Sequence, residues 1–300
     1  MFKIAWAPLY HHPLPENHRF PMEKYSLLPD QLIFEGTVTK DHFFIPLPVT
    51  EDEILLCHSK LYWDKLSNLQ LTPSEIRKSG FPLSEQLVQR EIIIAGGTLQ
   101  AARYALDFGV SMNIAGGTHH AFTDRGEGFC LLNDVAIAAS VLLKEQTIKR
   151  ALIVDLDVHQ GNGTAEIFQT NPDVFTFSMH GKKNYPLHKE SSDLDIELED
   201  GTTDDQYLSI LIEELPNLIE YQKPEIIFFQ SGVDVLQSDK LGRLALSIQG
   251  CRERDRIVFN QSYAAGIPVV VTMGGGYSER IADIVEAHAN TFRLAASIWS

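Results

Sequence analysis

Two aspartates and a histidine occupy alternate positions of one short segment. Asp155, Asp157 and His159 are spaced i, i+2 and i+4, at the end of an apolar run. Alternate side chains of an extended backbone point the same way, so the three groups should converge. Ionised carboxylates that crowd on one face repel each other unless a cation lies between them. The spacing therefore favours a metal site, and one histidine with carboxylates suits Zn²⁺, Fe²⁺ or Co²⁺.

Asp234 follows a second apolar run and is a natural third ligand. Three protein ligands would leave one position open for water or substrate, as a catalytic metal requires. The alternative for Asp234 is a turn or a helix N-cap, and for Asp155 and Asp157 a solvated strand end that caps the next helix. That alternative would explain an isolated pair of aspartates, but it gives no reason for His159 or for the glycines that follow.

Two further groups could take part in catalysis. His119 and His120 follow a Gly-Gly pair, and a neutral imidazole beside a metal site is a competent general base. Tyr277 follows three glycines, and its hydroxyl could donate to a developing oxyanion. The alternatives are two satisfied core histidines and a plain turn with Tyr277 packed in the core. A phosphate loop is disfavoured because neither G-x-G-x-x-G nor G-K-[ST] is present.

Most of these residues follow short, continuous apolar runs, which are typical of strands covered on both faces. The predicted strands are 111–115, 151–156, 174–179, 225–230 and 267–273. Helical patterns separate most of them, at 134–143, 204–219 and 251–264. Strands that alternate with helices indicate a three-layer α/β fold, with a mostly parallel central sheet and helices on both faces. Ligands of such sheets bind outside the carboxyl ends of the strands, where these residues lie.

Several helix starts are also legible in the sequence. Thr50, Thr72 and Thr203 are each followed three residues later by a glutamate or a glutamine, which is the capping-box spacing. One long helix is predicted over 83–108, and Gly96-Gly97 should weaken or kink it.

The composition is that of a globular protein, and we predict a single domain over residues 1–300. Hydrophobic residues make up 44% of the chain, so it can bury a sizeable core. The formal net charge of −15 disfavours nucleic acid as a partner, because phosphates would be repelled. No apolar stretch reaches about 18 residues, so we expect no membrane span. Three widely spaced cysteines and the lack of a signal-peptide pattern favour the cytoplasm.

Five separated motifs resemble the zinc-dependent histone deacetylase family, which has the arginase/deacetylase fold. They occur between about residues 90 and 280, in the order and spacing of the family. The matching segments are GTHHA (117–121), GEGFCLLND (126–134), DLDVHQGNGT (155–164), GVD (232–234) and GGGY (274–277). Two more, HRFPM (18–22) and DKLGRL (239–244), resemble the bacterial class IV, or eleventh-type, branch. That branch makes longer fatty acyl groups a reasonable expectation for the substrate.

The resemblance implies two kinds of cation site. Asp157, His159 and Asp234 would hold Zn²⁺, with Fe²⁺ as the alternative ion. A monovalent cation, expected to be a structural K⁺, would bind beside them. Its site would be formed by Asp155, Asp157, His159, Ser178 and Met179. A second monovalent site would map near Phe168, Asn171 and Val174.

The resemblance also implies the catalytic roles. His120 would be the general base. His119, hydrogen-bonded to Asp155, would be its electrostatic partner and a proton donor to the leaving amine. Tyr277 would polarise the amide carbonyl of the substrate.

The channel for an acyl-lysine side chain would be lined by Gly128 and Phe129. One position departs from many class I members, because Asn162 stands where they have Asp behind the second histidine. An amide cannot stabilise an imidazolium as a carboxylate does, so the pKa of His120 should be lower than in those members. The acidic segment 181–205 does not align well, and we expect it to form part of an acidic rim.

The function indicated by these features is zinc-dependent hydrolysis of acetyl-lysine or a longer fatty acyl-lysine in a protein or peptide. Deacylation of a small amine, such as an acetylated polyamine, is an alternative on the same machinery, and an acidic rim would suit either cationic substrate. An arginase-like dimanganese enzyme is less well supported, because that family needs additional aspartate ligands. A non-catalytic acyl-lysine-binding protein is the remaining alternative, although every expected catalytic group is present.

Overall fold

One sheet of eight parallel strands organises the chain, and the computed structural model describes residues 1–299. Its strands are β1 (Lys3–Ala5), β2 (Phe43–Phe44), β3 (Val110–Asn113), β4 (Ala151–Asp155), β5 (Val174–Gly181), β6 (Leu194–Leu198), β7 (Ile226–Gln230) and β8 (Val269–Thr272). The strand order is β2-β1-β3-β8-β7-β4-β5-β6. The predicted α/β class and the parallel sheet are therefore confirmed.

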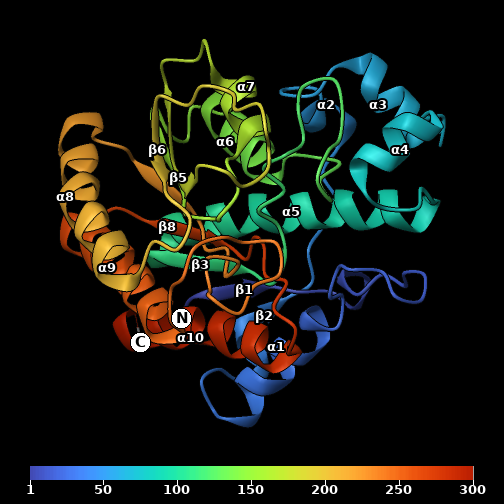
Figure 1. Cartoon of the computed structure of the whole chain (residues 1–300). Coiled ribbons are helices and arrows are strands. Elements are labelled where there is room, and N and C mark those ends of the chain that lie inside the picture. Colours follow the sequence, from blue (N-terminus) through green and yellow to red (C-terminus); the bar gives the residue numbers. More distant parts are fainter. Residues whose placement is uncertain (300) are drawn as a thin grey trace.

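Helices cover both faces of this sheet (Figure 1). They are α1 (Lys24–Phe34), α2 (Glu51–Ile54), α3 (Lys60–Ser67), α4 (Pro73–Ser79), α5 (Glu85–Phe108), α6 (Asp134–Lys144), α7 (Asn162–Phe168), α8 (Asp204–Gln222), α9 (Ile248–Ala265) and α10 (Ile281–Trp299). Two short 3₁₀ turns, at Pro8–Tyr10 and Lys40–His42, complete the described elements. On one side α5 packs on β1, β3 and β8 and contacts α6, which contacts α7. On the other side α9 contacts α8 and α10, and α10 contacts α1.

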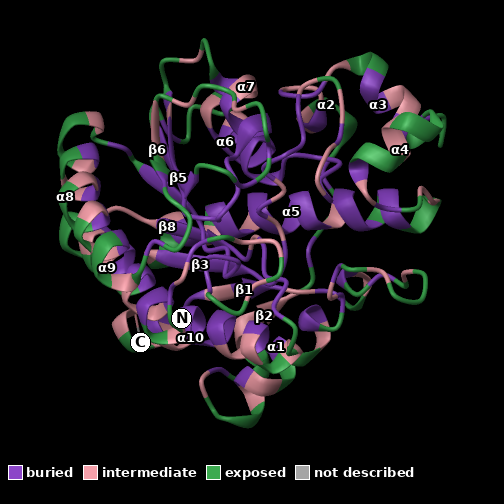
Figure 2. Ribbon diagram, viewed as in Figure 1, coloured by how far each residue is buried: buried purple, intermediate pink, exposed green. Residues whose placement is uncertain are grey.

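The five predicted strands correspond to β3, β4, β5, β7 and β8. Nearly all of their residues are buried, which explains why their sequences are continuously apolar (Figure 2). Three strands were not predicted. β1 and β2 are too short to produce a pattern, whereas β6 alternates apolar and polar residues as a half-exposed edge strand does. β6 lies within segment 181–205, so part of this segment belongs to the edge of the sheet.

The long helix α5 continues through Gly96 and Gly97 without ending at this expected weak point. A Cβ atom on Gly96 would lie 1.8 Å from the carbonyl oxygen of Leu47, and one on Gly97 would lie 2.4 Å from the hydroxyl of Tyr10. The two glycines therefore allow neighbouring segments to approach the helix closely. The three predicted capping boxes are present, at the starts of α2, α4 and α8.

The order of the strands brings the chemical motifs together. After β3 the chain crosses over to β4 and continues outward to β5 and β6, and β7 and β8 then fill the gap between β3 and β4. The five strands that precede the motifs are consequently neighbours in the middle of the sheet. Because they are parallel, their carboxyl ends meet at one edge. Segments more than a hundred residues apart in the sequence can therefore build one site.

A single hydrophobic cluster includes buried residues from Phe2 to Ala295. On this basis we propose that residues 1–300 form a single domain. Within residues 1–299 no helix is long and apolar enough to cross a membrane.

Candidate metal centre and active site

Three buried side chains converge where β4 and β7 end. Asp157 and His159 lie on the turn after β4, and Asp234 lies on the turn after β7. The Nδ1 atom of His159 is 3.0 Å from Oδ1 of Asp157 and 3.1 Å from Oδ2 of Asp234. One ligand atom from each residue lies within 4.8 Å of the other two, as a shared metal ion requires. The structure thus brings together the three residues that the sequence singled out as metal ligands.

The electrostatics of this group fit a divalent cation. Burial, and then the charge of Asp157, raise the pKa of Asp234 to about 7. Burial also lowers the pKa of His159, but its hydrogen bonds to both carboxylates outweigh burial and raise the pKa to about 10. Two buried carboxylates therefore demand a positive charge at this point, and an imidazolium or a metal ion could supply it. Two carboxylate oxygens and one imidazole nitrogen are a suitable donor set for Zn²⁺ or Fe²⁺.

The backbone around the three ligands fixes their positions. The N–H group of Gly275 donates to Oδ2 of Asp157 at 2.7 Å. A Cβ atom at Gly275 would lie 1.9 Å from Oδ2 of Asp234, so only glycine fits here. Nη1 of the buried Arg254 donates to the carbonyl oxygens of Leu156 and Gly232, at 3.1 and 2.5 Å. Arg254 thereby joins the ends of β4 and β7, a role that the sequence did not reveal because α9 is distant in the chain.

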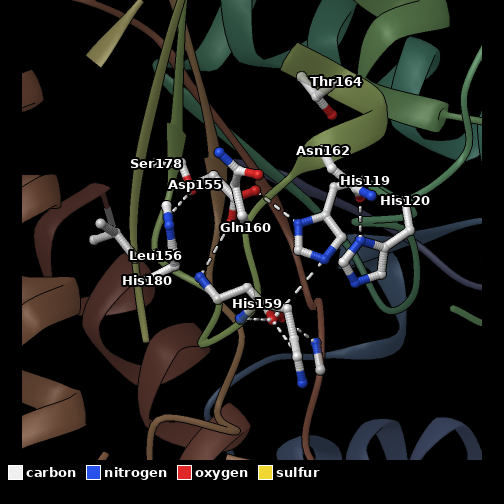
Figure 3. A network of polar contacts seen from close by, with 12 residues as sticks. His119, His120, Asp155, Leu156, His159, Gln160, Asn162, Thr164, Ser178 and His180 are labelled. Carbon is white, nitrogen blue, oxygen red and sulfur yellow. Dashed lines mark hydrogen bonds and ion pairs between the residues drawn. The ribbon is translucent and has the colours of Figure 1, made fainter. Parts of the chain in front are cut away.

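His119 and His120 lie beside the metal-ligand group, each with a different partner (Figure 3). Nδ1 of His120 is 2.6 Å from Oδ1 of Asn162, an acceptor, so it donates its proton and leaves Nε2 free as a base. Burial, and then the charges of His119 and His159, hold the pKa of His120 well below its usual value. Nδ1 of His119 is 2.7 Å from Oδ2 of Asp155. Burial lowers the pKa of His119, but the carboxylates of Asp155 and Asp157 outweigh burial and raise it.

Three hydrogen bonds hold the glycine loop that carries Tyr277. Gly275 donates to Asp157, as described, and the N–H of Tyr277 donates to Oδ2 of Asp239 at 2.6 Å. Nζ of Lys24 donates to the carbonyl oxygen of Gly274 at 3.1 Å. Burial, and then the negative charges of Asp234 and Asp157, raise the pKa of Tyr277 well above its usual value, so its hydroxyl stays a donor.

Lys24 was not recognised as a site residue from the sequence. Its side chain is fully buried, and its ammonium lies 5.9 Å from the ring centroid of Tyr277. Burial lowers the pKa of Lys24 to about 8, while the carboxylates of Asp234 and Asp157 oppose this shift. A buried ammonium behind Tyr277 offsets part of the negative charge of the ligand group. Nothing in the local sequence signals this role, since Lys24 comes into contact with Gly274 only through folding.

A cavity opens from the surface toward these groups. This mouth cavity has a volume of about 200 Å³, and the residues that line it are Arg19, Lys78, His120, Gly128, Phe129, His159, Tyr185, Leu241 and Tyr277. Both residues expected in the channel, Gly128 and Phe129, line it. Tyr185 lies against His120, with ring centroids 4.9 Å apart, and its hydroxyl donates to Oε2 of Glu127 at 2.6 Å. The sequence gave no sign of Tyr185, because its loop after β5 carries no pattern.

A second, inner cavity of about 40 Å³ shares five lining residues with the mouth cavity: His120, Gly128, Phe129, His159 and Tyr277. Its lining includes His119, His120, Asp157, His159 and Tyr277. Phe20, Tyr25 and Ile94 contribute apolar or aromatic surface to it.

Segment 181–205 contributes to the mouth cavity, as expected for part of the rim, but the expectation that this rim is acidic is wrong. Tyr185 is the member of segment 181–205 that lines it, and the charged residues at its entrance are Arg19 and Lys78. The acidic part of the segment lies instead around β6 and a separate cavity lined by Glu166, Glu190 and Asp193. β6 is the edge strand farthest from β4 and β7 on this side of the sheet, and Asp200 after it pairs with Lys183 and Arg243.

The residues expected to hold monovalent cations fall into two groups. Asp155 lies opposite Ser178 in the β4–β5 pairing, with Met179 next to Ser178. The second set lies on the turn between α7 and β5. There the N–H of Asn171 donates to the carbonyl of Phe168 at 2.9 Å, and that of Val174 donates to Asn171 at 3.4 Å.

Known proteins are similar to this chain over most of its length. Residues 18–292 match the family described as "Histone deacetylase domain". The chain is 43% identical over 298 residues to an uncharacterized protein of Picosynechococcus sp., and this match covers 99% of each chain. It is 30% identical to Histone deacetylase 2 of Arabidopsis thaliana, over 89% of this chain and 72% of the relative.

Solved structures share the fold as well. An HDAC homolog from Aquifex aeolicus superposes with a TM-score of 0.83 at 27% identity, covering 97% of this chain and 82% of the other. An HDAC homolog complexed with SAHA gives a TM-score of 0.85 at 26% identity, covering 99% of this chain and 84% of the other. The sheet and the site at its edge define a hydrolase of the arginase/deacetylase fold. The chain belongs to the histone deacetylase family. Its place in the bacterial class IV branch stays a prediction.

The contact between His120 and Asn162 leads to a prediction about pH. As the expected general base, His120 would have to be unprotonated, so activity should fall as pH drops through its pKa. In Asn162→Asp a carboxylate would face Nδ1 and raise this pKa by about one unit or more, and the acid limb of the kcat/KM profile should move to higher pH. Asn217→Asp, at an exposed position of α8, is the matched control. An acid limb that stays in place in Asn162→Asp would contradict this account.

Lys24 leads to a second prediction. Lys24→Met removes the hydrogen bond to Gly274 and the charge behind Tyr277, so we expect kcat to fall about tenfold with little change in KM. Lys24→Arg should recover part of the loss, because it restores a cationic donor. Steady-state kinetics on one peptide would measure both variants, and thermal unfolding would report folding separately. Equal kcat values for wild type and a folded Lys24→Met would show that the ammonium does not support Tyr277.

Proposed function

We propose that this protein is a zinc-dependent lysine deacylase that removes short acyl groups from protein or peptide lysines. The observation that supports it most directly is the convergence of Asp157, His159 and Asp234 beneath the mouth cavity, with His120 and Tyr277 lining the same cavity. Zn²⁺ held by these three residues would lower the pKa of a bound water and polarise the acyl carbonyl. Fe²⁺ is the alternative ion for the same ligands.

Two histidines would carry out the two proton transfers of the reaction. Nε2 of His120 takes a proton from water, because its low pKa keeps it neutral and its Nδ1–H is held by Asn162. His119 has a raised pKa through Asp155, which suits it to donate a proton to the leaving lysine amine. The hydroxyl of Tyr277 donates to the oxygen that gains negative charge, an interaction worth roughly 3–4 kcal/mol.

The acyl group should be short. The inner cavity of about 40 Å³ has room for about three water molecules, at roughly 10–15 Å³ each. An acetyl group fits such a space, whereas an octanoyl or myristoyl chain would need the cavity to open. This supports acetyl over the longer fatty acyl groups that the class IV resemblance suggested.

A lysine in a protein or peptide fits the entrance better than a polyamine does. Phe129 and Tyr185 can enclose the aliphatic part of one lysine side chain between aromatic walls. An acetylated polyamine would bring its remaining ammonium toward Arg19 and Lys78, which repel it. A non-catalytic binding protein is not supported either, because the base, the proton donor and Tyr277 are all present beside the ligand group.

Two further features belong to this proposal. Asp155, Ser178 and Met179 would hold a K⁺ ion that stabilises the ends of β4 and β5. The turn of Phe168, Asn171 and Val174 would hold a second one. We also propose a cytoplasmic location, which is supported by three buried, unpaired cysteines.

Substitution of the ligands tests the assignment of the metal. Asp157→Ala or His159→Ala should abolish metal binding and turnover together, because neither the ion nor its charge would be held. Tyr277→Phe should keep the metal and lose about two to three orders of magnitude in kcat. Metal content by elemental analysis, with turnover of an acetyl-lysine peptide, measures both effects. Stoichiometric zinc in Asp157→Ala would contradict the assignment.

An acyl-length series tests the size of the inner cavity. We expect kcat/KM to be highest for acetyl-lysine and to fall at least tenfold for octanoyl- and myristoyl-lysine in the same peptide. N-acetylputrescine should be a poorer substrate than the acetyl-lysine peptide. A higher kcat/KM for octanoyl- or myristoyl-lysine would overturn the preference for short acyl groups, without affecting the deacylase reaction itself.

A further inference from the structure

The entrance of the mouth cavity is cationic, although the whole chain has a formal net charge of −15. Arg19 and Lys78 are exposed and line its outer part. Among residues 1–299 no aspartate or glutamate lines this cavity. The sign of the charge at the entrance is thus opposite to that of the protein as a whole.

Both cations are attached to the wall of the channel. Lys78 lies in the last turn of α4, and its carbonyl oxygen accepts the N–H of Gly128 at 3.0 Å. The carbonyl of Ser79 accepts the N–H of Phe129 at 2.7 Å. The guanidinium carbon of Arg19 lies 4.9 Å from the ring centroid of Phe129, which is a cation–π contact. The positions of the two charges are therefore coupled to the wall that would contact the substrate.

One carboxylate, that of Glu127, lies near Lys78 but is also bound by two other partners. Glu127 forms a long ion pair with Lys78, with Nζ and Oε1 4.0 Å apart. Its Oε1 accepts a hydrogen bond from Nε of Arg125 at 2.8 Å, and its Oε2 accepts the one from Tyr185. Arg19 has no hydrogen bond or ion pair to a carboxylate in the described part of the chain. Arg19 consequently remains available to a ligand at the entrance, and exposed Lys78 is held only by this long ion pair.

We propose that Arg19 and Lys78 select acyl-lysines that are flanked by acidic residues. This inference rests on the proposed deacylase function, since the flanks reach the entrance only when the acyl-lysine occupies the channel. Aspartate or glutamate beside the acylated lysine would lie within reach of both cations and within a Debye length at moderate salt, about 10 Å at 0.1 M. Basic flanks would meet the same charges and be repelled.

Three peptides with one acetyl-lysine and acidic, neutral or basic flanks test this selection. For the zinc-loaded full chain we measure kcat/KM by amine release and binding by fluorescence anisotropy. We expect the acidic peptide to exceed the basic one by about 5- to 20-fold at low salt, and less at high salt. Lys78→Glu and Arg19→Glu should each reduce this ratio by about 2- to 5-fold, and the double variant should remove or reverse it.

Lys144→Glu is the matched control. Lys144 is an exposed lysine in the last turn of α6, and this helix begins at the carboxyl edge of the sheet and runs away from it for about 16 Å. It carries the same change of charge and should leave the ratio of the acidic to the basic peptide unchanged.

The outcomes separate the selection from the reaction. Equal turnover of the three peptides, or a ratio unaffected by Lys78→Glu and Arg19→Glu, would overturn the selection and leave the deacylase function standing. Binding that prefers the acidic peptide and depends on both cations, without any hydrolysis, would support the entrance site and overturn the deacylase function.

Discussion

Two carboxylates buried side by side are the constraint on which the rest of the structure depends. Asp157 and Asp234 lie out of contact with water, and both approach the same nitrogen of His159. Such a pair is unstable unless a positive charge lies between them. The raised pKa values of His159 and Asp234 express this demand. A bound divalent ion would meet this demand and release the proton that His159 otherwise holds.

The fold can hold these carboxylates because hydrogen bonds fix the positions of the segments that carry them. Gly275 donates to one of them and leaves room for the other, and Arg254 joins the two strand ends that carry them. The order of the sheet places β3, β8, β7, β4 and β5 next to each other. Side chains that follow β3, β4, β7 and β8, and Tyr185 after β5, therefore reach one point although they are distant in the sequence. Lys24 adds a buried positive charge from the opposite end of the sequence.

The sequence revealed the site residues that directly follow predicted strands. It did not reveal residues that reach the site only through contacts between distant segments. Asp155, Asp157 and His159 were readable from their i, i+2, i+4 spacing, although β4 ends at Asp155, which pairs with His119, and the other two lie on the turn after it. His119 with His120 and Tyr277 were readable because glycines precede them. Lys24, Arg254 and Tyr185 carry no such signal, since each acts through a contact between distant segments. The acidic rim was misjudged for a related reason, because composition alone could not show that the acidic residues lie around edge strand β6.

The most direct test is a crystal structure of the zinc-loaded protein with anomalous scattering data collected at the zinc edge. The account predicts one strong peak at about 2.0–2.2 Å from Nδ1 of His159 and from one oxygen each of Asp157 and Asp234. A protein that contains zinc but shows the peak elsewhere, or shows no peak while His159 pairs with both carboxylates, would contradict it.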